Sequence, residues 1–253
     1  MFTYEVIIPT KNEYNNLKIL LPSIKKKIRH PILIIDNSDD RYKNKMISLC
    51  KKNNVKFFKQ KSSGKGKALV EAAQLSKADI IIFFDADCSH SLLDLKKIIN
   101  IFNNFKNIDH VGGSRMRGGS DELFNNLTHL VRLFGSMIIT SLFNIKFNSN
   151  LTDTQNGLRG IKRKLFLNLN TVSTHTTIEM EMVGKTLLQG FNYVEIPTHE
   201  YSRIHGVSKI DLYKHSLSYV ICLLSIIFSK KTGKKLFNIK LNDSINKNIY
   251  LNK

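Results

Sequence analysis

Short apolar runs alternate with stretches of helical periodicity through the first half of the chain. Strands are predicted at residues 4–8, 32–35, 55–58 and 80–84. Helices are predicted at residues 14–28, after the turn at 37–40 as far as residue 53, at 68–75 and at 92–105. Strand and helix alternating at short intervals favour a parallel sheet with right-handed crossovers. The first half is therefore predicted to be an α/β nucleotide-binding layer.

The most informative run is Ile-Ile-Ile-Phe-Phe at residues 80–84, which is followed by Asp85 and Asp87. An unbroken apolar run is typical of a strand buried on both faces, and open parallel sheets bind ligands at the carboxyl ends of their strands. Two carboxylates placed there repel each other, and a shared cation relieves that repulsion. Oxygen ligands suit Mg²⁺ or Mn²⁺, which also bind substrate phosphates. An ordinary strand followed by a polar turn is the alternative.

The second half of the chain has a less regular pattern. We predict a strand at residues 110–114, a long helix at 123–145, a polar loop at 148–160, a helix at 178–188, a strand at 193–196 and a loop at 199–209. The long helix carries an apolar stripe of Leu123, Leu127, Leu130, Phe134, Ile138 and Leu142. Its opposite stripe is polar and consists of Asn125, Thr128, Arg132 and Ser136. Residues from 230 onward are rich in Lys and Asn, so we expect one domain at residues 1–229 and a mobile tail at 230–253.

Composition narrows the class of protein and its surroundings. A chain of 253 residues with 42% apolar residues can form one sizeable core, and its net charge of +19 attracts anions such as nucleotides and phospholipid head groups. No nucleic-acid-binding signature is present, so nucleic acid is not an expected partner. The three cysteines, Cys50, Cys88 and Cys222, are odd in number and far apart, which favours a reducing compartment. The N-terminus enters a strand directly, so no signal peptide is expected.

Eight short motifs in a fixed order carry a resemblance to a known family. They are Val-Ile-Ile-Pro-Thr-Lys-Asn-Glu at 6–13, Ile-Asp-Asn-Ser at 35–38, Gly-Lys-Gly-Lys-Ala at 64–68, Asp-Ala-Asp at 85–87, Gly-Gly-Ser-Arg at 112–115, Asp-Thr-Gln-Asn-Gly-Leu-Arg at 153–159, Glu-Met-Glu-Met at 179–182 and Gly-Val-Ser-Lys at 206–209. With this set the chain resembles family 2 glycosyltransferases of the GT-A fold, and within them the polyprenyl (dolichyl) phosphate hexosyltransferases. The resemblance covers about residues 4–210, and the motifs are specific only in combination.

The resemblance implies an α/β fold: a Rossmann-like, mostly parallel sheet flanked by helices, with C-terminal interfacial helices. It implies an inverting, metal-dependent transfer of a hexose from GDP-mannose or UDP-glucose to a polyprenyl phosphate. Asp85 and Asp87 would hold Mg²⁺ or Mn²⁺ on the diphosphate. His90 occupies the position of a third ligand, where Asp or Gln is more usual, and a solvated turn histidine is the alternative.

Donor contacts also follow from the resemblance. Pro9, Glu13 and Asp36 correspond to base and ribose contacts, since a carboxylate at a strand end can accept both hydrogen bonds of a ribose diol; Asp36 could instead cap a turn. Lys65 could attract the donor phosphates or be solvated, but its surroundings lack P-loop spacing. In the family, the late loop that carries Arg203 and Lys209 closes over donor and acceptor.

The acceptor phosphate is expected to meet Arg115, Arg132 and Gln155, because arginine donates two parallel hydrogen bonds to phosphate. A phosphate is already ionised at neutral pH, so we expect Asp153 to orient the sugar or the acceptor and not to remove a proton. The roles of Glu179 and Glu181 stay open between function and structure. The residues expected to carry catalysis are Asp85, Asp87, Asp153 and Arg115.

Alternatives differ in acceptor and in class. A transferase acting on a sugar or protein acceptor would need a base, which Asp153 could supply. A processive polysaccharide synthase would need a Gln-x-x-Arg-Trp motif, and the chain has no Trp. A nucleotidyltransferase would have a glycine-rich loop after the first strand, and a non-catalytic nucleotide-binding protein would be expected to have lost one acid of the pair.

Two apolar stretches, at residues 123–145 and 216–229, suggest contact with a membrane. The second is too short to span a bilayer, and both could lie in the interface or could be ordinary core helices. The lysines at 230, 231, 234 and 235 would add attraction to an anionic leaflet. We therefore expect a cytoplasmic enzyme held peripherally on the cytoplasmic face of a membrane.

Overall fold

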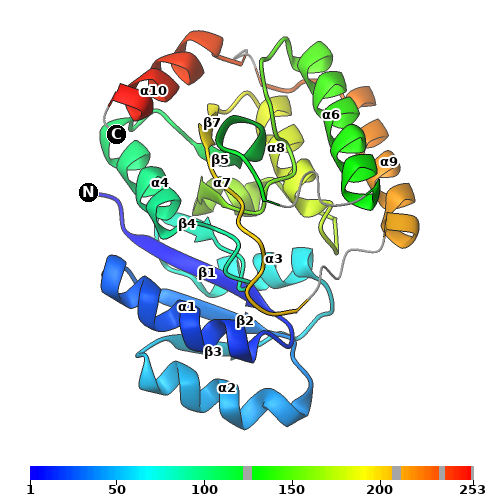
Figure 1. Ribbon diagram of the computed structural model, residues 1–253. Helices are drawn as coiled ribbons and strands as arrows, with labels where there is room; N and C mark the ends of the chain where they lie inside the picture. Colours follow the sequence, from blue (N-terminus) through cyan, green and yellow to red (C-terminus); the bar gives the residue numbers. More distant parts are fainter. Residues whose placement is uncertain (122–126, 207–211, 234–236, 252–253) are drawn as a thin grey trace.

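A seven-stranded sheet forms the centre of the computed structural model, which describes residues 1–121, 127–206, 212–233 and 237–251. The strand order is β3-β2-β1-β4-β6-β5-β7 (Figure 1). The strands are β1 (Tyr4–Thr10), β2 (Ile32–Asp36), β3 (Lys56–Lys59), β4 (Ile80–Phe83), β5 (His110–Ser114), β6 (Arg159–Lys162) and β7 (Tyr193–Pro197). Only β6 among them runs antiparallel to its neighbours, β4 and β5. The predicted mostly parallel sheet is confirmed.

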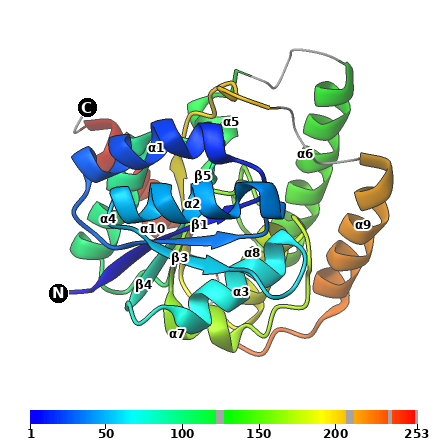
Figure 2. The ribbon, with the colours of Figure 1, turned by 90° about the horizontal axis from the view of Figure 1, so that it is seen from below.

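Helices cover both faces of this sheet. One face carries α1 (Tyr14–Lys27), α2 (Asp40–Lys52), α4 (Leu92–Asn104) and α10 (Ile239–Leu251). The other face carries α3 (Lys65–Leu75), α7 (Arg163–Asn168) and α8 (Ile178–Leu188). Figure 2 shows α1 and α2 on one side of the sheet and α3 and α7 on the other. A further pair, α6 (Leu127–Phe147) and α9 (Leu212–Phe228), packs outside α8, and α5 (Arg115–Gly118) follows β5 directly.

The apolar runs of the central strands serve both helical layers. Val6 and Ile8 belong to the core under α1 and α4, while Ile7 between them packs with α3 and α7. Successive side chains of a strand point to opposite faces, so a strand between two layers is apolar at most of its positions. This explains why 80–84 could be recognised without any alternation.

Strand β6 lies at the end of the segment that was predicted to be a polar loop, 148–160. Its sequence, Arg-Gly-Ile-Lys, is four residues long and contains two charged side chains, so hydrophobic periodicity could not reveal it. Arg159 is nevertheless fully buried, because its guanidinium donates to the carbonyl oxygens of Asn156 and Glu179. The short helix α7 was missed for the same reason of length.

The end of the chain differs from the expected mobile tail. Residues 239–251 form α10, which packs against β7. Ile245 is buried in the main core, and Leu241 and Ile249, four residues before and after it, pack against that core. This helical spacing is short and set among Lys and Asn residues, so composition concealed it. The boundary expected at residue 229 therefore does not separate a folded part from a free one.

The long helix α6 presents Phe134, Ile138 and Leu142 of its predicted apolar stripe outward. Phe134 and Ile138 are each 62% exposed, whereas Thr140, Phe143 and Phe147 are buried. Of the two predicted stripes, Leu123 and Asn125 lie outside the described residues. By length and composition alone, one helix in the described part of the chain could cross a membrane, and it includes His129–Phe147. Only 17% of the apolar stretch in this helix is buried inside the protein.

Candidate active site

The carboxyl end of β4 carries a chain of alternating charges. Nζ of Lys65 lies 2.7 Å from Oδ1 of Asp85 and 2.8 Å from Oε1 of Glu179. Lys65 begins α3 and Glu179 lies in the first turn of α8, so three separate elements converge on one ammonium group. Burial lowers the pKa of Lys65, but the two carboxylates outweigh burial and raise it above its ordinary value. The lysine is therefore ionised.

Asp85 is ionised as well. Burial raises its pKa, but Lys65 and His90 lower it below the usual range. Nε2 of His90 lies 3.4 Å from Oδ2 of Asp85, and the imidazole is almost fully buried. Burial lowers the pKa of His90, but Asp85 beside it raises the pKa above the ordinary value. The predicted third metal position thus lies next to the first acid.

Asp87 faces a different set of partners. Its Oδ1 accepts hydrogen bonds from the backbone N–H of Ser89 at 3.1 Å and from the Ser89 hydroxyl at 2.7 Å. Its Oδ2 lies 3.0 Å from Nη2 of Arg203. The turn is set by Cys88, whose φ of 64° is in the left-handed region. Lys65 thus pairs with Asp85, and Arg203 pairs with Asp87. Lys209, also expected in this late loop, lies outside the described residues.

The acidic and imidazole side chains at the end of β4 are the candidate ligands of the expected Mg²⁺ or Mn²⁺. Within the ranges that the structure describes, no three His, Cys, Asp or Glu side chains form a complete metal cage. The side chains of Asp85 and His90 lie next to each other. Asp87 is separated from Asp85 only by Ala86. Mg²⁺ sites usually take one or two carboxylates and complete their shell with substrate phosphates and water. The residues present therefore fit a cation that shares its ligands with a diphosphate.

A second charged cluster involves Arg115 and Asp153. Nε of Arg115 lies 2.7 Å from Oδ2 of Asp153, and Nη2 lies 3.0 Å from Oδ1, so the pair is bidentate. The backbone N–H groups of Arg115 and Gln155 also donate to this carboxylate. Nη1 of Arg115 lies 3.5 Å from Oε2 of Glu200. Burial raises the pKa of Asp153, but Arg115 outweighs it and lowers the pKa below the ordinary value.

Glu195 on β7 is a buried acid that sequence reasoning missed. Its Oε2 accepts from the N–H of Thr152 at 2.7 Å and from the Thr152 hydroxyl at 2.8 Å, while Oε1 accepts from the N–H of Asp153 at 2.9 Å. Burial raises the pKa of Glu195 to about 7, against the effect of these donors. One signal could have found it, namely a Glu inside the apolar strand Tyr-Val-Glu-Ile-Pro.

The predicted donor residues line the same end of the sheet. Asp36, which ends β2, is fully buried and accepts from the hydroxyls of Thr10 and Ser38. Its Oδ2 lacks a hydrogen-bond partner among the described residues. Pro9 lies on β1, paired in register with Ile35. Glu13 precedes α1 and accepts from the side chain of Asn16.

The loop at residues 153–157 joins the two charged clusters. A Cβ at Gly157 would lie 2.3 Å from Oδ2 of Asp85, so only glycine allows the loop this close to the acid. Nε2 of Gln155 is buried and has no hydrogen-bond partner within the described structure. Arg132 lies half-buried on α6. The structure thus brings Lys65, Asp85, His90, Asp153 and Gln155 to one region.

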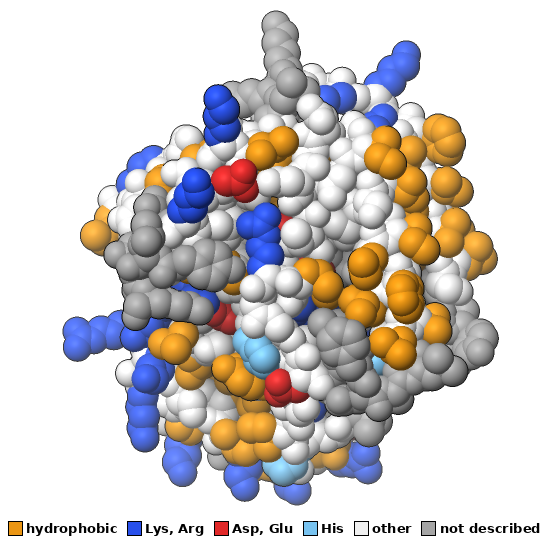
Figure 3. Space-filling model, turned by 45° about the horizontal axis from the view of Figure 1, so that its top comes forward, with side chains coloured by type: hydrophobic (Ala, Val, Ile, Leu, Met, Phe, Trp, Pro, Cys, Tyr) orange, Lys and Arg blue, Asp and Glu red, His pale blue; other side chains and the backbone are white. Residues whose placement is uncertain are grey.

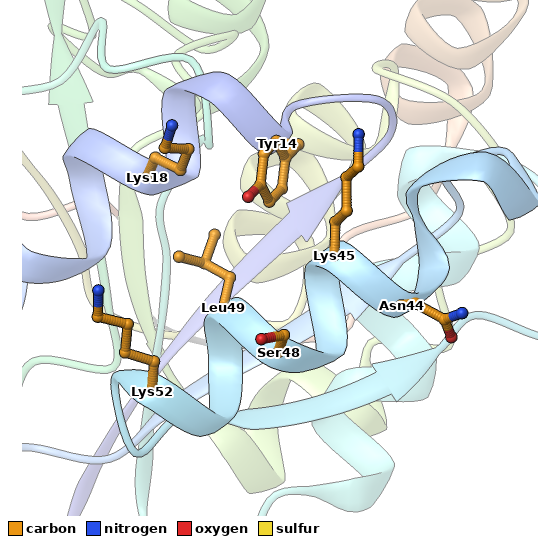
Figure 4. Close-up of a pocket in the computed structure, with 7 residues that line it drawn as sticks. All are labelled: Tyr14, Lys18, Asn44, Lys45, Ser48, Leu49 and Lys52. Carbon is orange, nitrogen blue, oxygen red and sulfur yellow. The ribbon is translucent and has the colours of Figure 1, made fainter.

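A separate groove of about 420 Å³ lies between α1 and α2. Figure 4 shows Tyr14 and Lys18 on α1 facing a row of side chains on α2. The α2 residues are Asn44, Lys45, Ser48, Leu49 and Lys52. Its three lysines attract anions in general, but none of the predicted site residues lines it.

Residues 5–169, which are more than half of the chain, match the family described as glycosyl transferase family 2. The chain belongs to this family. It is therefore an enzyme, a glycosyltransferase that uses a nucleotide sugar.

Two relatives illustrate the similarity in sequence. The low-salt glycan biosynthesis hexosyltransferase Agl6 of Haloferax volcanii is 24% identical over 186 residues, which cover 72% of this chain and 43% of that protein. The uncharacterized protein MJ1222 of Methanocaldococcus jannaschii is 28% identical over 221 residues, which cover 83% of this chain and 87% of that protein.

Solved structures show the same fold. The crystal structure of glucosyl-3-phosphoglycerate synthase from Mycobacterium tuberculosis superimposes with a TM-score of 0.69 at 16% identity, covering 92% of this chain and 81% of that chain. It contains Mn²⁺, uridine diphosphate and phosphoglyceric acid. At this identity the likeness concerns the fold, and it confirms the GT-A architecture.

Proposed function

We propose that this glycosyltransferase moves a hexose from a nucleotide sugar to a polyprenyl phosphate at a membrane surface, with inversion at the anomeric carbon. The observation that carries the proposal is that the Asp153 carboxylate is fully hydrogen-bonded and has a lowered pKa. A hydroxyl acceptor needs a general base within reach, and an efficient base has a pKa near the working pH. A phosphate acceptor needs none, because it is already ionised.

Asp153 is poorly suited to accept a proton. Both carboxylate oxygens are bound by the guanidinium of Arg115, two backbone N–H groups add to them, and the pKa lies below the ordinary value. A carboxylate held in this way orients an arginine. Nη1 of Arg115, which does not bind Asp153 and lies 3.5 Å from Oε2 of Glu200, is the group that would meet an anionic acceptor. This favours an acceptor phosphate over an acceptor hydroxyl.

An exposed apolar surface on α6 and α9 supports a lipid acceptor. Figure 3 shows hydrophobic side chains gathered along one side of the molecule. The most exposed of them on these two helices are Phe134, Ile138, Ile145, Leu217, Ile221 and Phe228. Contiguous apolar surface of this kind marks a membrane or protein interaction site. Apolar area on paired surface helices suits insertion into the head-group region of a bilayer.

The chain's own side chains are placed to assist departure of the nucleotide diphosphate. Lys65 and Arg203 lie against Asp85 and Asp87, so two cations flank the end of β4. Such preorganised charge, aimed at the developing negative charge of a leaving group, is usually the largest contribution to catalysis. Mg²⁺ or Mn²⁺, held by Asp85 and Asp87 with His90 beside them, would supply further neutralisation of the diphosphate.

A transfer assay tests the proposal directly. The enzyme is incubated with UDP-glucose or GDP-mannose and with farnesyl phosphate, farnesol or 3-phosphoglycerate as acceptor. We expect a glycosylated product from farnesyl phosphate with one of the two donors, and none from farnesol. Product from 3-phosphoglycerate alone would overturn the lipid proposal and favour the acceptor of the structurally similar synthase.

Replacing Arg132 with Ala tests the acceptor side. Arg132 is half-buried on α6, the helix that carries the exposed apolar side chains Phe134 and Ile138. Loss of a charge-assisted hydrogen bond to phosphate is expected to raise the KM for farnesyl phosphate about tenfold. The KM for the nucleotide sugar should stay within about twofold. An effect on the donor alone would assign Arg132 to the nucleotide site.

A further inference from the structure

A carboxylate on β7 connects the C-terminal helix to the arginine of the acceptor cluster. We propose that Glu195 is a positioning residue, which fixes residues 152–153 and thereby sets the orientation of Arg115. The inference rests on the proposed acceptor role of Arg115 for its effect on turnover. Its structural part, the anchoring of the loop, stands on contacts that do not depend on the acceptor.

The loop at residues 152–153 binds both carboxylate oxygens of Glu195. Two successive backbone N–H groups, those of Thr152 and Asp153, point at the two oxygens of Glu195. The Thr152 hydroxyl donates to Oε2 and is also 2.6 Å from the hydroxyl of Ser114. Arg117 is close as well, with Nε 3.9 Å from Oε2. The side-chain oxygens of Glu195 are the acceptors in all three of these hydrogen bonds, so the position needs two acceptor oxygens.

The next residue along the loop transmits this anchoring to the cluster. The backbone of Asp153 is fixed by Glu195, and its side chain then holds Nε and Nη2 of Arg115. Arg115 stands at the start of α5, directly after Ser114 at the end of β5. A shift of the 152–153 backbone would therefore turn the guanidinium away from its present direction.

Helix α10 fixes Glu195 from the other side. The N–H of Glu195 donates to Oδ1 of Asn242 at 2.9 Å, and its carbonyl oxygen accepts from Nδ2 of Asn246 at 2.9 Å. Asn150, at the beginning of the same loop, accepts from Nδ2 of Asn242 and donates to Asp243. Helix α10 therefore forms hydrogen bonds with both strand β7 and the loop that begins at Asn150. Residues near the C-terminus thus take part in positioning the acceptor cluster.

The test uses Glu195→Gln in the full-length chain. The variant keeps the size of the side chain, but its NH₂ group must face at least one donor of Thr152 or Asp153. We expect faster hydrogen exchange at the amides of Thr152 and Asp153 and a rise of about tenfold in the KM for farnesyl phosphate. The affinity for UDP, measured by calorimetry, should stay within about twofold. Asn242→Ala should shift both readouts in the same direction by less.

Glu181→Gln serves as the matched control. Glu181 is equally buried and accepts from the backbone N–H groups of Val172 and Ser173, on a different loop. It should lower the melting temperature similarly without raising exchange at Thr152 and Asp153. Unchanged exchange at these two amides in Glu195→Gln would overturn the proposal. Equal changes in acceptor KM and UDP affinity would also overturn it, because they indicate general damage. If the wild-type enzyme does not use farnesyl phosphate, the acceptor proposal fails and amide exchange still decides the anchoring.

Discussion

Asp85→Asn is expected to reduce hexose transfer at least about 100-fold, the size of effect seen when one preorganised electrostatic contact of an active site is lost. The amide removes the charge that holds Lys65 and His90 at the end of β4, and it removes the first acid of the proposed cation site. Initial rates with the preferred donor and farnesyl phosphate measure the loss. Circular dichroism should show an intact fold.

Asp79→Asn is the control for this prediction. Asp79 lies just before the opposite end of β4, where it binds Thr3, so the same chemical change is made far from the site. This variant should transfer hexose at the wild-type rate. Full activity of the wild-type enzyme in excess EDTA would contradict the role given to Mg²⁺ or Mn²⁺, and equal loss in both variants would contradict the role given to Asp85.

Replacing Ile138 and Leu217 together with Glu is expected to reduce binding to anionic vesicles at least about 100-fold. Both side chains are exposed by more than 60%, and they lie on the adjoining helices α6 and α9. Burying an aliphatic side chain contributes roughly 1.5–3 kcal/mol, so losing two corresponds to about two or more factors of ten. Flotation with vesicles of phosphatidylcholine and phosphatidylglycerol measures the change.

A matched variant, Leu93→Glu with Val172→Glu, adds the same charges at exposed apolar positions on α4 and in the loop before α8. It should float as well as the wild-type protein. We expect wild-type binding to weaken at high salt and to be reversed by alkaline carbonate, as for a peripheral protein. Resistance to carbonate would show that the helix containing His129–Phe147 inserts across the bilayer. Absence of flotation at low salt would remove the membrane from the proposal.

The α/β layer was predictable because its central strands β2 and β4 are almost entirely apolar. An unbroken apolar run such as 80–84 predicts a strand whose two faces are both covered. The intervening helices are predicted by their apolar residues at helical spacing. β6 and α10 were not predictable in the same way. β6 is a four-residue strand that contains the buried Arg159, whose burial depends on the carbonyl oxygen of Asn156 nearby in the chain and that of Glu179, 20 positions later. The apolar residues of α10 are set among Lys and Asn residues, and the helix packs on β7.

The sequence could name candidate site residues but not how they pair. Motifs pointed to Asp85, Asp87, Arg115 and Asp153 as separate residues. Only the fold places Arg115 opposite Asp153, 38 positions later in the chain, and this pairing adds a structural argument against a proton-accepting role for Asp153. Glu195 belongs to no motif that we recognised, because its partners are backbone amides that any sequence could supply.

The two outermost strands of the sheet are protected from self-association in different ways. At one border, β3 carries Lys56 and Lys59, and charged lysines discourage another strand from adding there. At the other border, Asn242 and Asn246 of α10 occupy the outward-facing backbone groups of Glu195. A chain shortened before residue 239 would therefore expose β7 as an open template for intermolecular pairing, so proteolytic trimming of the C-terminus would favour aggregation.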